Sequence, residues 1–142
     1  MPQPATTLLF VYGSLRSGFH HPAYNYISRY FTPLGPARVA GTLFDMGAYP
    51  AARPDDTGRQ IIGELYQIKN IEEWDWAIAQ LDDYEGVQPD EDGPALYERC
   101  LTRVEHATGP TTAWIYWYAG DVTGRPIVAS GDVLEYLQRK NH

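Results

Sequence analysis

Two short segments contain residue types that could carry chemistry on a small molecule, and the first follows the apolar run Leu8–Tyr12. There the chain reads Gly13-Ser14-Leu15, and we expect Gly13 to adopt a backbone conformation closed to other residues. A buried strand that opens into such a turn can aim several N–H groups at one point, which suits an anion or a developing oxyanion. The same residues also fit an ordinary strand followed by a turn.

The second segment is Asp82-Asp83-Tyr84-Glu85-Gly86, which places three carboxylates at the end of a predicted helix. The helix dipole disfavours negative charge there, so we expect Asp82 and Asp83 to stay hydrated on the polar face. Glu85 could instead turn inward, where partial burial raises the pKa of a carboxyl group and suits it to act as a general base. A plain acidic helix end, terminated by Gly86, is the alternative interpretation.

The elements that must position these segments follow from the spacing of apolar residues. Alternation predicts strands and recurrence every three or four residues predicts helices, the second of which Asn70 and Glu73 cap at its start. The predicted strands are 8–12, 37–45, 60–68, 97–105 and 111–119, and the predicted helices are 22–30, 71–82 and 132–140. This order predicts an α+β fold, with a mixed, mostly antiparallel, barrel-like sheet flanked by short helices.

Composition limits the class of protein. The 142 residues predict one domain, 1–142, with a loose N-terminal arm at 1–7. A net charge of −7 without a basic run argues against a nucleic-acid surface. Because no apolar stretch approaches the roughly 18 residues of a membrane helix, we expect no membrane partner. The single cysteine, Cys100, fits a reducing compartment, so we expect a soluble cytoplasmic protein.

Other polar residues give weaker signals. His20 and His21 are adjacent, which is not the spacing of metal ligands, and the acidic loop around Asp90 lacks the remaining positions of a calcium loop. Cys100 lies in the middle of a predicted strand, where a small packing residue is the simpler interpretation. We therefore expect no metal site.

Taken together, the motifs resemble the γ-glutamylcyclotransferase-like family, also called AIG2-like. The resemblance rests on VYGSLR at 11–16, GTLFDMGAYPA at 41–51, LDDYEG at 81–86 and Tyr97-Glu98-Arg99 at the start of the following strand. These motifs occur in order along nearly the whole chain. With Leu15 at a position where other branches have Asn, the sequence is most similar to the γ-glutamylamine cyclotransferase branch.

This resemblance implies a compact barrel flanked by helices with a pocket at one end. It implies that the enzyme converts a γ-glutamyl compound to 5-oxoproline and releases an amine, without metal or cofactor. The implied roles are substrate binding for Tyr12, Gly13, Ser14 and Leu15, general acid/base catalysis for Glu85, and pocket lining for Tyr97 and Tyr116. The implied partner is a small γ-glutamyl molecule, and the oligomeric state is left open.

Two other function classes fit the same residues. A non-catalytic binding module could keep the pocket and use the acid to hold an ammonium group. An interaction protein could instead use its aromatic surface, since aromatic residues make up 13% of the chain. The presence of both Tyr12-Gly13-Ser14 and Glu85 favours the enzyme over either alternative.

Overall fold

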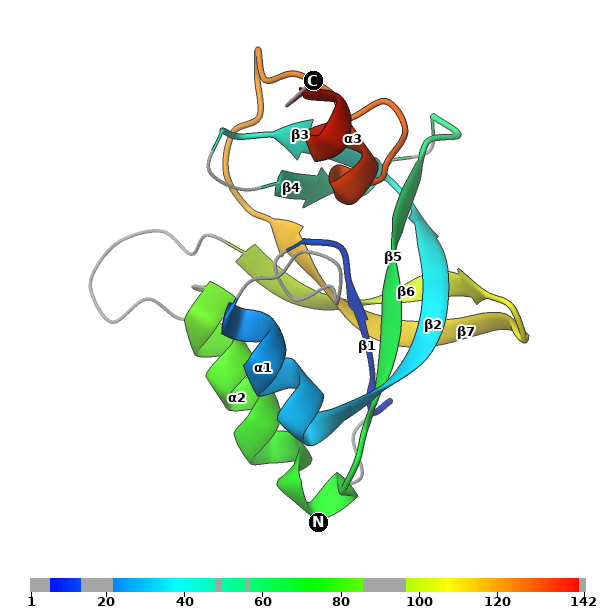
Figure 1. The fold of residues 1–142 in the computed structure, drawn as a ribbon, viewed down its shortest axis with the longest axis vertical. Helices are drawn as coiled ribbons and strands as arrows, with labels where there is room; N and C mark the ends of the chain where they lie inside the picture. The colour runs from blue at the N-terminus through cyan, green and yellow to red at the C-terminus, as the bar shows by residue number, and fades with distance from the viewer. Residues whose placement is uncertain (1–5, 14–21, 48–49, 56, 86–96, 141–142) are drawn as a thin grey trace.

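The computed structural model describes residues 6–13, 22–47, 50–55, 57–85 and 97–140 (Figure 1). The elements are β1 (Leu8–Val11), α1 (Pro22–Tyr30), β2 (Phe31–Ala40), β3 (Thr42–Asp45), β4 (Pro50–Arg53), β5 (Gln60–Ile68), the 3₁₀ turn η2 (Ile71–Glu73), α2 (Trp74–Glu85), β6 (Tyr97–His106), β7 (Gly109–Tyr118) and α3 (Val133–Lys140). The expected helices are all present, and α2 extends three residues beyond its expected end.

Five strands close into a barrel in the order β1-β5-β2-β6-β7. β1 pairs antiparallel with β5 and makes a parallel contact with β7, which closes the ring. The other pairings, β2 with β5, β2 with β6 and β6 with β7, are antiparallel. β3 and β4 form a separate antiparallel hairpin at one end of the barrel. The α+β class with a mixed, mostly antiparallel barrel is therefore confirmed.

Two expected segment boundaries were wrong. β2 starts at Phe31 and runs through Pro33 and Pro36, so it begins six residues before the predicted start of this strand at Ala37. The register with β5 shifts between Pro33 and Gly35, and β6 pairs with β2 only further along, at Ala37 and Arg38. Proline is tolerated in a strand at such a bulge or unpaired edge, because no ladder bond needs its missing N–H.

The predicted strand 37–45 is in fact two strands, β2 and β3, separated at Gly41. A Cβ atom at Gly41 would lie 2.8 Å from the carbonyl oxygen of Arg53 at the end of β4. Only glycine therefore fits at this junction between β2 and β3. Pro50–Arg53, which lies outside all the predicted strands and helices, forms β4 and pairs with β3. The hairpin is short, which is why alternation alone did not predict it.

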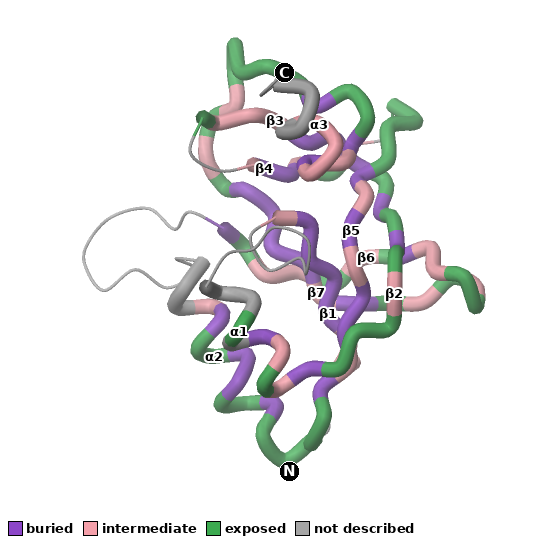
Figure 2. The backbone as a smooth tube through the Cα atoms, in the orientation of Figure 1, coloured by how far each residue is buried: buried purple, intermediate pink, exposed green. Residues whose placement is uncertain are grey.

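Buried residues lie along the barrel strands and parts of the helices (Figure 2), and alternating residues of the strands supply two apolar clusters. The first, which we call the inner cluster, fills the barrel and includes Phe10, Leu65, Val104 and Ile115, together with Val133 of α3. The second, the outer cluster, lies between the sheet and the helices and includes Leu9, Val11 and Tyr66 of the strands, Ile27 of α1 and Leu81 of α2. Each strand therefore contributes to both clusters, because its side chains alternate between the two faces.

Local hydrogen bonds fix the starts of several elements. Asn70 accepts a bond from the backbone N–H of Glu72 at 3.0 Å, which confirms it as a cap, and Asp132 accepts from the N–H of Leu134 at 3.0 Å.

The start of the described chain is held by long-range bonds: the backbone oxygen of Thr6 accepts from the Trp114 side chain, and that of Thr7 accepts from the N–H of Ile68. The last two residues of the expected loose arm, Thr6 and Thr7, are thus held against the barrel, while residues 1–5 lie outside the described structure.

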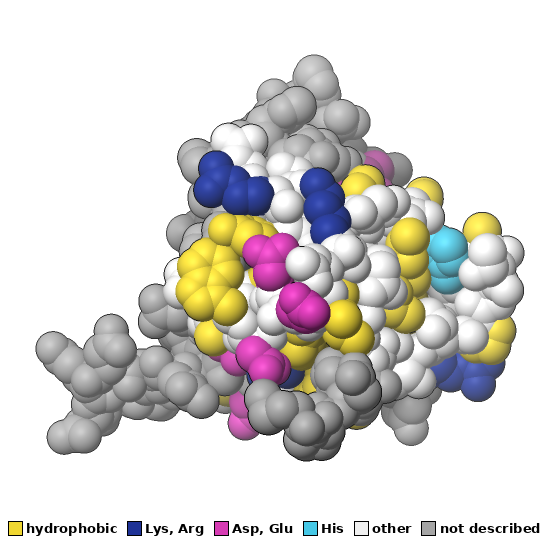
Figure 3. Space-filling model, turned by 90° about the horizontal axis from the view of Figure 1, so that it is seen from below, with side chains coloured by type: hydrophobic (Ala, Val, Ile, Leu, Met, Phe, Trp, Pro, Cys, Tyr) yellow, Lys and Arg dark blue, Asp and Glu magenta, His cyan; other side chains and the backbone are white. Residues whose placement is uncertain are grey.

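The end of the molecule at which α2 begins presents hydrophobic, acidic and basic side chains close together (Figure 3). Ile71 and Trp76 are about half exposed here, and the Trp76 ring makes an edge contact with Tyr30 at a centroid distance of 5.1 Å. Isolated exposed hydrophobic side chains of this kind are ordinary on a protein surface.

Candidate functional site

The first motif leaves β1 at the end that points toward the β3–β4 hairpin (Figure 1). Tyr12 is buried in the inner cluster, and its hydroxyl donates a hydrogen bond to the backbone carbonyl of Tyr116 on β7. Gly13 follows, but it is not among the described glycines with positive φ, so the expected special conformation is wrong. Its lack of a side chain has a different reason: a Cβ atom would lie 3.1 Å from the Pro50 ring on β4.

The second motif forms the last turn of α2, which ends at Glu85. Asp82, expected to stay hydrated, instead faces the barrel with its side chain only 13% exposed. Arg99 of β6 donates to both of its carboxylate oxygens, from Nε at 2.7 Å and from Nη2 at 3.1 Å. The Tyr116 hydroxyl donates to the same carboxylate at 2.8 Å. The guanidinium charge and the phenol therefore make up for the unfavourable position of this acid at a helix C-terminus.

Four residues at alternating positions on β6 and β7 connect the turn after β1 with the last turn of α2. We call them the β6–β7 platform: Tyr97, Arg99, Tyr116 and Tyr118. Tyr97 is registered opposite Tyr118, and Arg99 opposite Tyr116, so all four lie on the outer face of one hairpin. The rings of Tyr97 and Tyr118 meet edge to face at 5.5 Å. The Arg99 guanidinium also lies 4.5 Å from the centre of the Trp114 ring, a cation–π arrangement.

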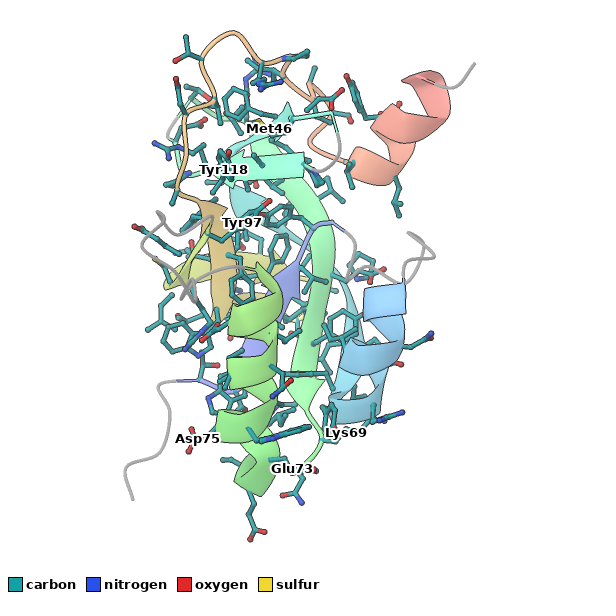
Figure 4. The ribbon with its side chains drawn as sticks, turned by 90° about the vertical axis from the view of Figure 1, so that its left-hand side faces the viewer. Met46, Lys69, Glu73, Asp75, Tyr97 and Tyr118 are labelled. Carbon is teal, nitrogen blue, oxygen red and sulfur yellow. The ribbon has the colours of Figure 1, made fainter. Side chains whose placement is uncertain are left out.

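The platform also reaches the β3–β4 hairpin. The Tyr97 hydroxyl donates to the carbonyl of Pro50 at 3.0 Å, and Arg53 donates to the carbonyl of Tyr118 at 2.9 Å. Figure 4 shows Tyr97 and Tyr118 between the upper end of α2 and the β3–β4 hairpin, in which Met46 follows β3, with Asp75 and Glu73 at the far end of the helix. The platform thus contacts the turn after β1, the last turn of α2 and the start of β4.

This arrangement brings the two sequence motifs toward one place. Tyr116 bonds to both, because its carbonyl accepts from Tyr12 and its hydroxyl donates to Asp82. Glu85 lies three residues after Asp82, so the two positions share one side of the helix. The side chain of Glu85, and residues Ser14, Leu15, His20 and His21, lie outside the described structure. Their proposed roles therefore remain predictions.

Sequence reasoning missed Arg99 and the partners of Asp82. The signal was present in Tyr97-Glu98-Arg99, since residues two apart on a strand lie on one face. An arginine beside an aromatic residue on that face is well suited to pair with a carboxylate from a covering element. Tyr97 and Tyr116, expected as pocket lining, are both buried, with exposed fractions of 8% and 3%.

A hollow elsewhere on the surface is lined by Thr42, Asp55, Thr57 and Arg59, among others. Burial raises the pKa of the Asp55 carboxyl group, but hydrogen bonds from Thr42 and Thr57 outweigh it and hold that pKa below its usual range. The hydrogen bonds of this carboxylate therefore connect the segment around Asp55 and Thr57 to the start of β3. It lies apart from the platform, on the side of β3 and the start of β5.

No group of three or more His, Cys, Asp or Glu residues in the described ranges of the chain is placed to hold a metal ion. Within the same ranges, no helix combines the length and apolar character needed to cross a membrane.

A family model described as "Gamma-glutamyl cyclotransferase, AIG2-like" matches residues 9–135. The chain is 33% identical over 104 residues, 72% of its length and 86% of the relative's, to a protein of Halalkalibacterium halodurans named "Putative gamma-glutamylcyclotransferase BH1612".

Solved structures show the same fold. Bacillus subtilis YkqA aligns with a TM-score of 0.71 and 26% identity, covering 96% of this chain and 42% of YkqA, so the present chain spans less than half of that protein. An AIG2-like protein from mouse aligns with a TM-score of 0.60 and 21% identity, covering 80% of this chain and 78% of the mouse chain. Because the family model spans most of the sequence, including both motifs that Tyr116 connects, the chain belongs to the gamma-glutamyl cyclotransferase, AIG2-like family.

Proposed function

We propose that this protein converts a γ-glutamyl compound to 5-oxoproline and releases an amine, with Glu85 as general acid and base. Membership of the family supports a cyclotransferase in general. The observation that carries the specific proposal is the double role of Tyr116, whose carbonyl and hydroxyl link the Tyr12-Gly13 turn to the helical turn that ends at Glu85. A base can act only on a substrate that the rest of the site holds within its reach.

The proposed reaction needs one proton acceptor that later becomes a donor. The Glu85 carboxylate removes a proton from the α-ammonium group of the substrate, and the freed amine attacks the γ-carbonyl carbon. The resulting tetrahedral oxyanion collapses, the bond to the leaving nitrogen breaks, and that nitrogen takes the proton from Glu85. The ring nitrogen gives up its second proton to the released amine, so the products are 5-oxoproline and an ammonium ion, with atoms and charge in balance. Ring closure is intramolecular, so holding the substrate folded supplies much of the rate.

The backbone of Gly13, Ser14 and Leu15 is proposed to hold the glutamyl part of the substrate. N–H groups in a turn suit either the α-carboxylate or the oxyanion. Tyr12 is proposed to fix this turn through its bond to Tyr116. Tyr97 and Tyr116 are proposed to line the pocket from the platform.

The substrate is proposed to be a γ-glutamylamine, because Leu15 makes the sequence most similar to the γ-glutamylamine cyclotransferase branch of the family. The first test is therefore a panel of γ-glutamyl amino acids, γ-glutamyl-ε-lysine and simple γ-glutamylamines, incubated with the protein. Formation of 5-oxoproline is measured by mass spectrometry. Binding of a panel compound without any 5-oxoproline would favour the binding-module alternative instead.

The second test is Glu85→Gln. Glutamine is nearly isosteric but does not accept a proton at neutral pH, so the α-ammonium group stays charged and cannot attack. We expect kcat to fall by about 10²–10⁴-fold, while calorimetric binding of the substrate stays within a few-fold of wild type. Asp75→Asn, at an exposed position in the first turn of the same helix, is the matched control and should keep full activity. Retained turnover in Glu85→Gln would remove this residue from the role of base.

A further inference from the structure

We propose that Asp82 is a positioning residue, which with Arg99 and Tyr116 clamps the last turn of α2 so that Glu85 is held in register with the Tyr12-Gly13 turn. This inference rests on the proposed function. It assigns a role to residues that do not themselves react, and it explains why an acid occupies a position that the helix dipole disfavours.

The orientation of the Asp82 carboxylate is determined by its contacts. It accepts two bonds from Arg99 and one from Tyr116, all between 2.7 and 3.1 Å. Arg99 is in turn held over the Trp114 ring, and the Tyr116 side chain is buried within the outer cluster. A carboxylate gripped by a planar guanidinium fork and a rigid phenol has little rotational freedom left.

The position of Asp82 along α2 allows the clamp to restrain Glu85. The last turn of an α-helix lacks partners for its final carbonyl groups and is the part that frays. Asp82 lies three residues, or about 4.5 Å of helical rise, before the last residue of α2. Fixing Asp82 to the barrel therefore fixes the turn on which Glu85 is carried.

The other half of the link is the backbone carbonyl of Tyr116, which accepts from Tyr12. Movement of β7 at this residue would shift the turn after β1 and the end of α2 together. Stability alone does not require this arrangement, since a partly buried ion pair is often no more stabilising than a well-packed apolar pair. Positional precision is the property that an apolar pair would not supply.

The key variant is Tyr116→Phe, which deletes one oxygen but keeps the ring and the carbonyl that holds Tyr12. With 5-oxoproline formation as readout, we expect kcat to fall about 10-fold and KM to stay within about 3-fold, because the substrate-holding backbone is untouched. Asp82→Ala should lower kcat by about 100-fold. The double variant should be no worse than Asp82→Ala, because both changes remove the same bond.

The matched control is Tyr136→Phe, which deletes a bond of the same kind, from a tyrosine hydroxyl to Asp45 at 2.8 Å, outside the clamp. It should leave kcat unchanged. The inference is overturned if Tyr116→Phe and Asp82→Ala keep wild-type kcat, or if their activity falls only in proportion to the folded fraction measured by circular dichroism.

Failure of the clamp and failure of the proposed function give different results. Wild-type turnover that is lost in Glu85→Gln but kept in Tyr116→Phe and Asp82→Ala refutes the clamp alone. Absence of turnover in the wild type refutes the function, and amide hydrogen exchange over residues 79–85 then decides the clamp. Faster exchange there in Asp82→Ala, but not in Asp75→Asn, supports it, and unchanged exchange overturns it.

Discussion

Consecutive side chains on β6 have opposite surroundings at Arg99 and Cys100. Arg99 points to the outer face and pairs with Asp82, whereas Cys100 packs against the inner cluster. Burial, followed by the negative charge of Glu98, raises the pKa of the Cys100 thiol. A raised pKa leaves less thiolate at neutral pH, and the thiolate is the reactive form. Cys100 therefore has the surroundings of a packing residue, in agreement with its interpretation from sequence.

We expect the thiol of the native protein to react with iodoacetamide at pH 7.5 several-fold more slowly than the thiol of the urea-unfolded chain. We also expect Cys100→Ser to keep wild-type turnover, since the cysteine takes no part in the proposed reaction. Mass spectrometry of alkylation against time measures the first, and the 5-oxoproline assay measures the second. A thiol as fast as the unfolded one, or loss of turnover in a folded Cys100→Ser protein, would contradict this role.

One side chain, that of Asp55, connects the two ends of the β3–β4 hairpin. The Thr42 hydroxyl, at the start of β3, bonds to Asp55, just after β4. Asp55 also accepts from the hydroxyl and the N–H of Thr57, at 2.8 and 3.2 Å. These bonds favour the ionised carboxylate, so the pKa of Asp55 is lower in the folded protein than its ordinary value of 3.8.

The lowered pKa predicts a defined pH dependence of stability. A depressed folded pKa contributes stability above the unfolded value, and that contribution is lost as pH falls through the folded pKa. Asp55→Asn should therefore lower the free energy of unfolding at pH 7 by up to about 1 kcal/mol, a small effect because the carboxylate is only partly shielded from water. The difference from wild type should shrink as the pH is lowered below 3.8.

Urea unfolding over a pH series measures this difference. The matched control is Asp121→Asn, because Asp121 accepts the same local bonds from Thr123, at 2.6 and 2.9 Å, but lies in the segment after β7, and the Thr42 hydroxyl of β3 bonds to Asp55 instead. It should have the smaller effect at pH 7. A difference for Asp55→Asn that stays constant with pH would show that the ionised form is not the stabilising one.

At the scale of the whole molecule, closure of the barrel depends on the close approach of β1 and β5. A Cβ atom at Gly63 would lie 2.2 Å from the carbonyl oxygen of Val11 and 2.7 Å from the Phe10 ring. The first neighbour is backbone and cannot rotate away. The same close approach sets where β1 ends, and therefore where Tyr12 and Gly13 lie relative to Tyr116.

Gly63→Ala should lower the free energy of unfolding by about 3 kcal/mol or more, because β1 must move to make room. Gly109→Ala is the comparison: its φ of +118° is strained for alanine, but a Cβ atom there meets nothing within 4 Å. We expect a cost of about 1–2 kcal/mol for it. Guanidinium unfolding of both variants measures the two losses. Equal losses would mean that the approach of β1 to β5 is not tight.

Much of the fold could be predicted because local patterns report local structure. The alternation in Gln60–Ile68 and the spacing within Pro22–Tyr30 predicted β5 and α1 with their observed bounds. Asn70 was predicted as a helix cap from its type and position. The family was also evident from sequence, because its motifs are short and occur in order along nearly the whole chain. Each element signal, and each single family motif, lies within a few neighbouring residues.

Tertiary structure alone decided the rest, because it depends on partners far away in the chain. Asp82 looked like a hydrated helix-end acid, and only the packing of α2 on β6 and β7 gave it Arg99 and Tyr116 as partners. Gly13 looked like a residue with an unusual backbone angle, and its actual neighbour is Pro50, 37 residues later. Sequence determined which residue types are available for chemistry, and long-range packing decided which of them meet.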